Sequence, residues 1–139
     1  MKRILIVDDC RVMRELTKVY LIARDVEIVE AGDGQEGLER ARARRPDLVL
    51  ADLVMPRMDG PALCAALAER PETRGVPVVI LTASRDPEPI RRALAAGAKD
   101  VLHKPIQPKA LHVVVERWLA PGAHPAHGPA LAAAAIARR

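Results

Sequence analysis

The segment DLVLADLVMP, residues 47–56, contains an apolar run that ends in the carboxylate of Asp52. Residues 47–52 are predicted to form a buried strand, because a continuous apolar run is typical of a strand covered on both faces. Met55-Pro56 and Asp59-Gly60 then turn the chain away from that strand. The segment therefore places Asp52 at the carboxyl end of a strand, which is where open parallel sheets bind their ligands.

The alternation of strand and helix continues along residues 1–120. Apolar runs predict strands at 3–8, 26–30, 77–82 and 99–103, and helical spacing predicts helices at 10–24, 35–45, 60–70, 86–97 and 108–120. Five strands that alternate with five helices predict an α/β domain, in which a parallel sheet is covered by helices on both faces. On the first helix, we expect one face to turn toward the core: Met13, Leu16, Val19, Tyr20 and Ala23.

Composition restricts the classes of protein that the chain can belong to. The 139 residues are 50% hydrophobic, which is enough for one domain with a core. No apolar stretch approaches the roughly 20 residues of a membrane span. Arg138 and Arg139 supply half of the net charge of +4, so residues 1–120 are nearly balanced, which argues against nucleic-acid binding. Cys10 and Cys64 predict reduced thiols in a cytoplasmic protein.

Residues 121–139 differ in composition from the segment before them. The stretch 121–129 is rich in proline and glycine and cannot hold a helix. Residues 130–139 are only marginally able to form a helix in isolation, because ten residues are too few. We therefore expect residues 1–120 to form the domain and residues 121–139 to form a flexible tail, with no room for a second domain.

Polar side chains stand at the predicted strand ends. They are Asp8 and Asp9 after the first strand, Asp52 on the third, Thr82 on the fourth and Lys104 after the fifth. Because the carboxyl ends of parallel strands share one edge of the sheet, we expect these side chains to meet there. Crowded carboxylates favour a bound cation, and ligands that are all oxygen suit Mg²⁺. A carboxylate nucleophile, a divalent metal, a lysine and a hydroxyl are the parts needed to form and hold an aspartyl phosphate.

Each of these residues also has an ordinary structural interpretation. Asp9 alone is more often the cap of a following helix, Asp52 can cap a turn, and Thr82 is an unremarkable strand residue. Lys104-Pro105 alone indicates only the end of a strand. Their joint occurrence at four strand ends, within an unbroken βα alternation, favours the functional interpretation.

Residues 1–120 resemble a response-regulator receiver domain, the phosphoacceptor module of two-component signalling, and in particular a stand-alone chemotaxis regulator. The resemblance rests on Asp8-Asp9, the segment from Asp52 to Gly60, Thr82-Ala83 and Lys104-Pro105, which match the family pattern in order and spacing. It implies a flavodoxin-like (βα)5 fold, a doubly wound parallel sheet with strand order 2-1-3-4-5.

The resemblance implies that Asp52 accepts a phosphoryl group from a sensor histidine kinase or a small phosphodonor. Mg²⁺ would be held by Asp9, Asp52 and the backbone carbonyl of Val54, with Asp8 contacting it through water. The chain would not be an enzyme in its own right, since it would catalyse only its own phosphorylation and dephosphorylation. Val54 and Ser84 occupy the positions that tune phosphoryl lifetime in the family, and the apolar Val54 predicts slow self-dephosphorylation.

Two further site residues follow from the resemblance, and two positions depart from it. Thr82 would bond to the phosphoryl group, and Lys104 would form a salt bridge with it and precede a cis peptide bond. Receivers usually carry Tyr or Phe three residues before this lysine, where the present chain has Val101. The family's aromatic switch therefore cannot operate here. Ile106 stands where Phe is common, which is a change of packing.

The expected output of such a receiver is a protein contact. The predicted surface comprises helix 86–97, strand 99–103 and helix 108–120, and it includes Arg91, Lys99, Val101 and Val113. Phosphorylation would shift a two-state equilibrium toward the form that binds the downstream target. We expect a cytoplasmic monomer or weak dimer that contacts neither membrane nor DNA directly.

Several alternatives are open at this point. A phosphorelay intermediate suits Val101, because a relay protein needs no large switch, and a weakly switching interaction module would keep the fold alone. A phosphatase with an aspartyl nucleophile is disfavoured, because the general acid expected two residues after the nucleophile is replaced by Val54. A DNA-binding regulator would need another chain or a longer one, because residues 121–139 have no capacity for a helix-turn-helix.

Overall fold

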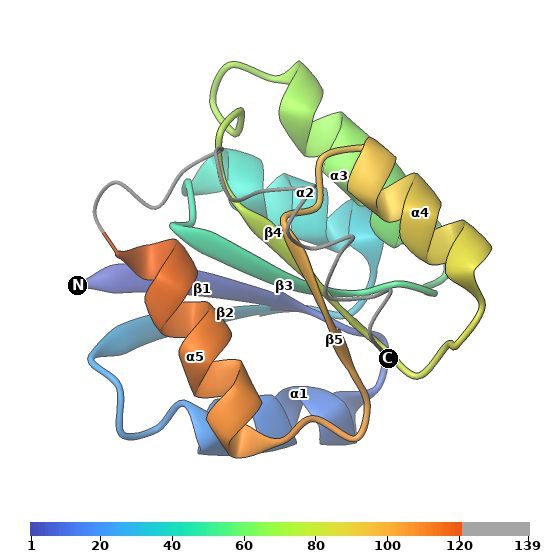
Figure 1. Ribbon diagram of the computed structural model, residues 1–139. Coiled ribbons are helices and arrows are strands. Elements are labelled where there is room, and N and C mark those ends of the chain that lie inside the picture. Colours follow the sequence, from blue (N-terminus) through green and yellow to red (C-terminus); the bar gives the residue numbers. More distant parts are fainter. Residues whose placement is uncertain (121–139) are drawn as a thin grey trace.

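The computed structural model describes residues 1–120, which form an α/β domain of three layers (Figure 1). The strands are β1 (Lys2–Val7), β2 (Val26–Ala31), β3 (Leu48–Asp52), β4 (Val78–Thr82) and β5 (Asp100–His103). The helices are α1 (Arg11–Tyr20), α2 (Gly34–Ala43), α3 (Gly60–Glu69), α4 (Pro87–Ala95) and α5 (Pro108–Leu119). The five predicted strands and five predicted helices are thus confirmed, with shifts at their ends.

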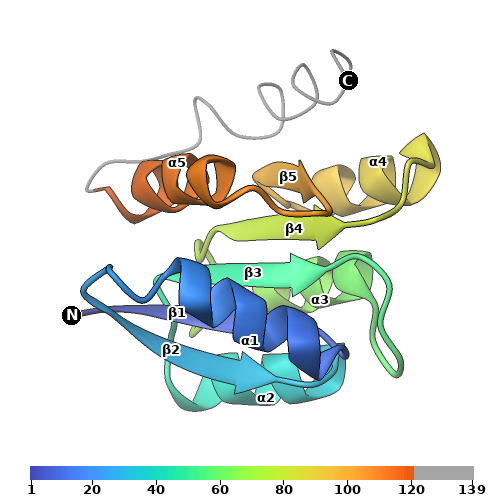
Figure 2. The same cartoon turned by 90° about the horizontal axis from the view of Figure 1, so that it is seen from below.

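The strands form one parallel sheet in the order β2-β1-β3-β4-β5, which confirms the flavodoxin-like order. Figure 2 shows the strands running in the same direction. Strand order reverses at β1, so the switch point of the sheet lies between the ends of β1 and β3, where such folds bind ligands. The register pairs Val7 with Ala51, which brings the residues that follow them, Asp8 and Asp52, to the same level.

Two apolar layers separated by the sheet make up the core. Helices α2, α3 and α4 cover one face, and α1 and α5 cover the other (Figure 1). Successive strand residues alternate between the layers, as in β3, where Val49 and Ala51 belong to the first layer and Leu48 and Leu50 to the second. Helices cover both faces of the sheet, which explains the continuous apolar runs in the sequence.

The predicted inward face of the first helix is wrong in part. Helix α1 is shorter than expected, and Leu16 and Val19 are exposed, at 36% and 58%. The buried face instead contains Thr17, whose hydroxyl donates to the carbonyl of Met13 at 2.8 Å. Because that bond satisfies the hydroxyl, threonine can occupy a core-facing position, and the apolar residues turn outward.

The loop between β3 and α3 packs against the start of α2. Arg57 has a positive φ of 67°, and its guanidinium lies 3.4 Å from the carboxylate of Asp33, the N-cap of α2. A Cβ atom on Gly34 would lie 2.0 Å from the carbonyl oxygen of Met58. Glycine at this position therefore permits the close contact between the loop that follows Asp52 and helix α2.

Within residues 1–120, no helix is long and apolar enough to span a membrane. The prediction of a flexible tail at residues 121–139 falls outside the described residues.

We expect Gly34→Ala to lower the free energy of unfolding by about 1–3 kcal/mol, the usual cost of overpacking against a fixed neighbour. Urea denaturation followed by circular dichroism measures the effect. Gly32→Ala is the matched control, because a Cβ there would meet no atom closer than 3.6 Å. Equal stability of the two variants would contradict the close contact.

Candidate functional site

Three carboxylates meet at the carboxyl edge of the sheet. Asp8 follows β1 directly and is 4% exposed, Asp52 ends β3 and is partly buried, and Asp9 is exposed. One ligand oxygen from each lies within 4.8 Å of the others. The structure thus brings together the three acidic residues that the sequence analysis selected.

Lys104 places a positive charge between two of these carboxylates. Its Nζ lies 3.1 Å from Oδ2 of Asp8 and 3.3 Å from Oδ2 of Asp52. The backbone N–H of Lys104 donates to the carbonyl of Thr82, which fixes the lysine beside the end of β4, and the peptide bond to Pro105 is cis, as the resemblance implied. The ammonium group therefore offsets part of the repulsion between Asp8 and Asp52.

Asp8 is held in place by contacts that sequence reasoning missed. Its Oδ1 accepts from the backbone N–H of Cys10 at 2.9 Å, and its own carbonyl accepts from Nη1 of Arg14 at 2.6 Å. Arg14 also forms an ion pair with Glu30 on β2, at 3.1 Å. No sequence motif marks Arg14, because the contact arises only when α1 packs beside the edge strand.

Asp9 does not cap helix α1, contrary to one interpretation of the sequence. The N-cap is Cys10, which makes no side-chain capping bond, and the side chain of Asp9 is exposed beside the acidic cluster. Without a capping role, the Asp9 carboxylate is free to serve as a metal ligand.

Thr82 belongs to the end of strand β4, and Val54 lies in the loop that follows β3. Thr82 ends β4 and is 1% exposed, and its hydroxyl accepts from the backbone N–H of Ser84 at 2.9 Å. Val54 lies two residues after Asp52 with 67% of its surface exposed. That Val54 lends its carbonyl to a metal, and that the Thr82 hydroxyl bonds to a phosphoryl group, stay predictions.

Burial and charge both perturb the titration of this site. Burial raises the pKa of the Asp52 carboxyl above its ordinary value, and the Asp8 carboxylate adds to that rise, while Lys104 opposes it. Burial lowers the pKa of Lys104, but Asp52 and Asp8 together outweigh burial, so the pKa of the ammonium is raised. Lys104 is therefore a permanent cation at neutral pH, and the Asp52 carboxylate is less stable than one in water.

The donor set fits a hard divalent cation. The three side chains offer only oxygen atoms, and an exposed member leaves room for the waters that Mg²⁺ retains. A divalent cation would also neutralise carboxylates that a single lysine compensates incompletely.

The chain therefore has the flavodoxin-like fold of receiver domains, and its acidic cluster lies at the switch point of the sheet. Residues 4–116 match the family model described as the response regulator receiver domain. The chain belongs to this family, as the sequence resemblance implied.

Relatives and solved structures agree with this assignment. The DNA-binding response regulator MtrA of Mycobacterium tuberculosis is 40% identical over 110 residues, 79% of this chain and 47% of MtrA. The chain thus spans about half the length of the curated MtrA relatives that it matches. Chemotaxis protein CheY4 of Vibrio cholerae has a TM-score of 0.79 at 31% identity, covering 86% of this chain and 99% of CheY4.

A magnesium-containing receiver has the same fold. The receiver domain of a sensor histidine kinase from Pseudomonas aeruginosa, described with a magnesium ion coordinated in its active-site cleft, has a TM-score of 0.79 at 27% identity. The match covers 85% of this chain and 97% of that domain. Receiver domains generally bind Mg²⁺, and the present chain carries the acidic cluster for it.

Val101 does not lie on the surface, contrary to the prediction. Its side chain is 1% exposed and packs in the layer between β4, β5 and α4, together with Ile80, Ala93 and Ala98. Val113 on α5 is 51% exposed and Arg91 on α4 is exposed, as expected. The buried orientation of the Val101 side chain is favoured, because turning it outward would remove apolar area from the core.

We expect Asp52→Asn to raise the free energy of unfolding by about 1 kcal/mol at pH 7 without divalent metal, a usual size for a single-site effect. The sign follows from the raised pKa of Asp52. A carboxyl whose pKa rises on folding destabilises the folded protein, and stability falls as the pH rises from its ordinary pKa through the raised one. The variant should lack that part of the pH dependence, which urea titrations at several pH values measure.

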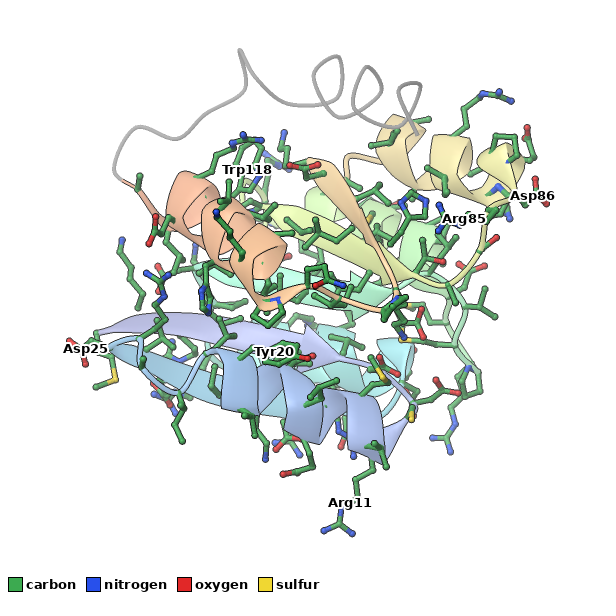
Figure 3. All side chains as sticks on the ribbon, turned by 60° about the horizontal axis from the view of Figure 1, so that its bottom comes forward. Arg11, Tyr20, Asp25, Arg85, Asp86 and Trp118 are labelled. Atoms are coloured by element: carbon green, nitrogen blue, oxygen red, sulfur yellow. The ribbon has the colours of Figure 1, made fainter. Side chains whose placement is uncertain are left out.

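Asp25→Asn serves as the control for this substitution, because Asp25 is exposed at the opposite end of the domain (Figure 3). It should leave stability within about 0.5 kcal/mol of the parent. A less stable Asp52→Asn protein would show that the ion pair with Lys104 outweighs burial and the repulsion from Asp8.

Proposed function

We propose that the chain is a phosphoacceptor in which Asp52 takes a phosphoryl group from a histidine kinase or a small phosphodonor. The observation that supports this most strongly is the placement of the Asp52 carboxylate between a lysine at 3.3 Å and two further carboxylates within 4.8 Å. A purely structural aspartate at a strand end would not need two acidic neighbours, because their repulsion costs stability.

The chemical step is a displacement at phosphorus. An oxygen of Asp52 forms the new O–P bond while the bond from phosphorus to the donor atom breaks, and the donor leaves with its electron pair. The phosphoryl oxygens then meet the Lys104 ammonium, which is released from Asp52 when that carboxylate becomes an acyl phosphate. Thr82, in the adjacent strand end, would donate its hydroxyl hydrogen to the phosphoryl group.

Asp9, Asp52 and the carbonyl of Val54 would hold Mg²⁺, and Asp8 would contact it through water. When bound, the metal supplies positive charge that neutralises carboxylates and phosphoryl oxygens. The chain's own residues position Asp8: the backbone N–H of Cys10 donates to its side chain, and Arg14 donates to its carbonyl. Asp9 is the exposed member of the set.

Receiver domains interact with histidine kinases, and the output of this one would be a protein contact through α4, β5 and α5. The exposed Arg91 and Val113 lie on that surface. The chain would act in the cytoplasm as a monomer or weak dimer, with catalysis limited to its own phosphorylation and dephosphorylation. MtrA is a DNA-binding regulator, but the match covers less than half of it, and we propose no direct DNA contact for residues 1–120.

A second candidate is a phosphorelay intermediate, and the burial of Val101 favours it. Val101 is 1% exposed and has no aromatic ring, so it cannot signal the state of Asp52 by turning a ring. A relay intermediate passes the phosphoryl group to a histidine and has less need of such a signal. The two roles share the same chemistry at Asp52.

Incubation with acetyl phosphate and Mg²⁺ should add one phosphoryl group, measured as intact mass. Asp52→Asn should gain none, because its amide cannot form the acyl phosphate. Omission of Mg²⁺ should reduce the yield in the parent. A gain in both proteins, or in neither, would overturn the assignment of Asp52.

We expect the phosphorylated parent to lose its phosphoryl group over minutes or longer, because the exposed Val54 cannot orient an attacking water by hydrogen bonding. Val54→Asn should shorten the lifetime roughly fivefold, the rate equivalent of one net hydrogen bond of about 1 kcal/mol. Mass spectra taken at intervals after removal of the donor give both lifetimes. Loss within seconds in the parent would contradict the role of Val54.

A further inference from the structure

Two hydrogen bonds fix the backbone on either side of the buried Asp8. The N–H of Asp8 donates to the carbonyl of Ala31, the last residue of the edge strand β2, at 3.1 Å. The carbonyl of Asp8 accepts from Nη1 of Arg14 on α1 at 2.6 Å. A peptide group is planar and includes the Cα atom of the residue that follows it. Arg14 therefore holds the peptide plane that carries the Cα atom of Asp9, and with it the direction in which the Asp9 side chain leaves the backbone.

The guanidinium of Arg14 is itself oriented by the edge strand. Its Nε lies 3.1 Å from Oε1 of Glu30, and the Arg14 side chain is only 18% exposed. Glu30 is a carboxylate at neutral pH, because Lys18 and, to a smaller extent, Arg14 lower its pKa against the effect of burial. A guanidinium presents its N–H groups in a fixed planar arrangement, so the contact with Glu30 also orients the group that reaches Asp8. The Glu30–Arg14 pair thus connects β2 to the peptide bond between Asp8 and Asp9.

We propose that Arg14 is a positioning residue of the metal site, which holds Asp9 in place for Mg²⁺ by fixing the peptide plane before it. The inference rests on the proposed Mg²⁺ site. Asp9 does not cap α1 and its side chain is exposed, so the position of its carboxylate depends on its backbone. Asp8, by contrast, is also held at its carboxylate, by the N–H of Cys10 and by Lys104. Arg14 therefore matters most for the carboxylate that has the least support of its own.

Charge alone predicts the opposite effect of Arg14 on the metal. A fixed cation near a site for Mg²⁺ repels the ion, so removal of Arg14 would strengthen Mg²⁺ binding if the residue acted through its charge. If Arg14 acts by holding the peptide plane, its removal frees Asp9, and the metal must then order that residue at a cost in affinity. The sign of the change in Mg²⁺ affinity therefore distinguishes positioning from charge.

Two other cations of α1 provide matched controls. Lys18 pairs with Glu30 at 2.7 Å, as Arg14 does, but from the next turn of the helix, further from the acidic cluster. Arg11 is closer to the cluster in the sequence, and its exposed side chain points into solvent (Figure 3). Lys18→Ala and Arg11→Ala each remove one positive charge, as Arg14→Ala does, but they leave the bond between Arg14 and Asp8 in place.

Titration of the full chain with MgCl₂ at constant ionic strength tests the proposal. Amide shifts of residues 8–10 in ¹H–¹⁵N spectra give the Kd for Mg²⁺, and the same spectra show that each variant is folded. We expect Arg14→Ala to raise the Kd about fivefold, the factor equivalent to one net hydrogen bond. Lys18→Ala and Arg11→Ala should leave the Kd unchanged or lower it. Arg14→Lys keeps the charge but not the planar set of donors, and it should raise the Kd at least about twofold.

The rate of phosphorylation separates positioning from a direct role in the chemistry. At saturating Mg²⁺, Arg14→Ala should gain mass from acetyl phosphate within about twofold of the parent rate, because Arg14 touches none of the reacting atoms. A rate that stays well below the parent's at saturating Mg²⁺ would give Arg14 a direct part in the reaction and overturn the inference.

The Kd values separate failure of this inference from failure of the metal site. An unchanged or lower Kd in Arg14→Ala, the parent Kd in Arg14→Lys, or equal rises in all three alanine variants would overturn the role of Arg14 and leave Asp52 as phosphoacceptor. Absence of Mg²⁺-dependent shifts in the parent would overturn the proposed metal site and this inference with it.

Discussion

The contact of the Lys104 ammonium with Asp8 and Asp52 is the interaction on which the rest of the site depends. Two carboxylates at the ends of adjacent strands would repel each other, and burial would increase the cost. The lysine reaches them because β4 pairs with β5 in a register that sets Thr82 opposite His103, one residue before Lys104. The charge balance of the site therefore depends on the β4–β5 register, because a shift of that register would move Lys104 away from Asp8 and Asp52.

Much of this arrangement could be predicted from the sequence, and the reason is physical. Continuous apolar runs identify strands covered on both faces, and polar residues at their ends mark the edge where those strands finish. Asp8, Asp52, Thr82 and Lys104 were found in this way, because each directly ends or follows such a run. The cis peptide before Pro105 came from the family resemblance and not from the run itself.

The sequence was less informative where packing between elements decides the outcome. Thr17 takes a buried position on α1, because its hydroxyl donates to a carbonyl one turn earlier, so apolar spacing alone wrongly placed Leu16 and Val19 in the core. Val101 was expected at the surface, although in the folded domain it closes the layer beneath α4. Arg14 acquires its role only from the distance between α1 and the edge strand. Each case involves a contact between segments that local patterns do not describe.

The scarcity of aromatic residues has a consequence for how this domain is observed. The chain has one Trp, one Tyr and no Phe, and both aromatic side chains lie in the layer formed by α1 and α5 (Figure 3). Trp118 is 5% exposed there, with the sheet between it and α2, α3 and α4. Trp118 fluorescence therefore reports on one face of the sheet only. Loosening of α4 would leave the Trp118 emission unchanged, whereas separation of α5 from the sheet would expose Trp118 and change its emission.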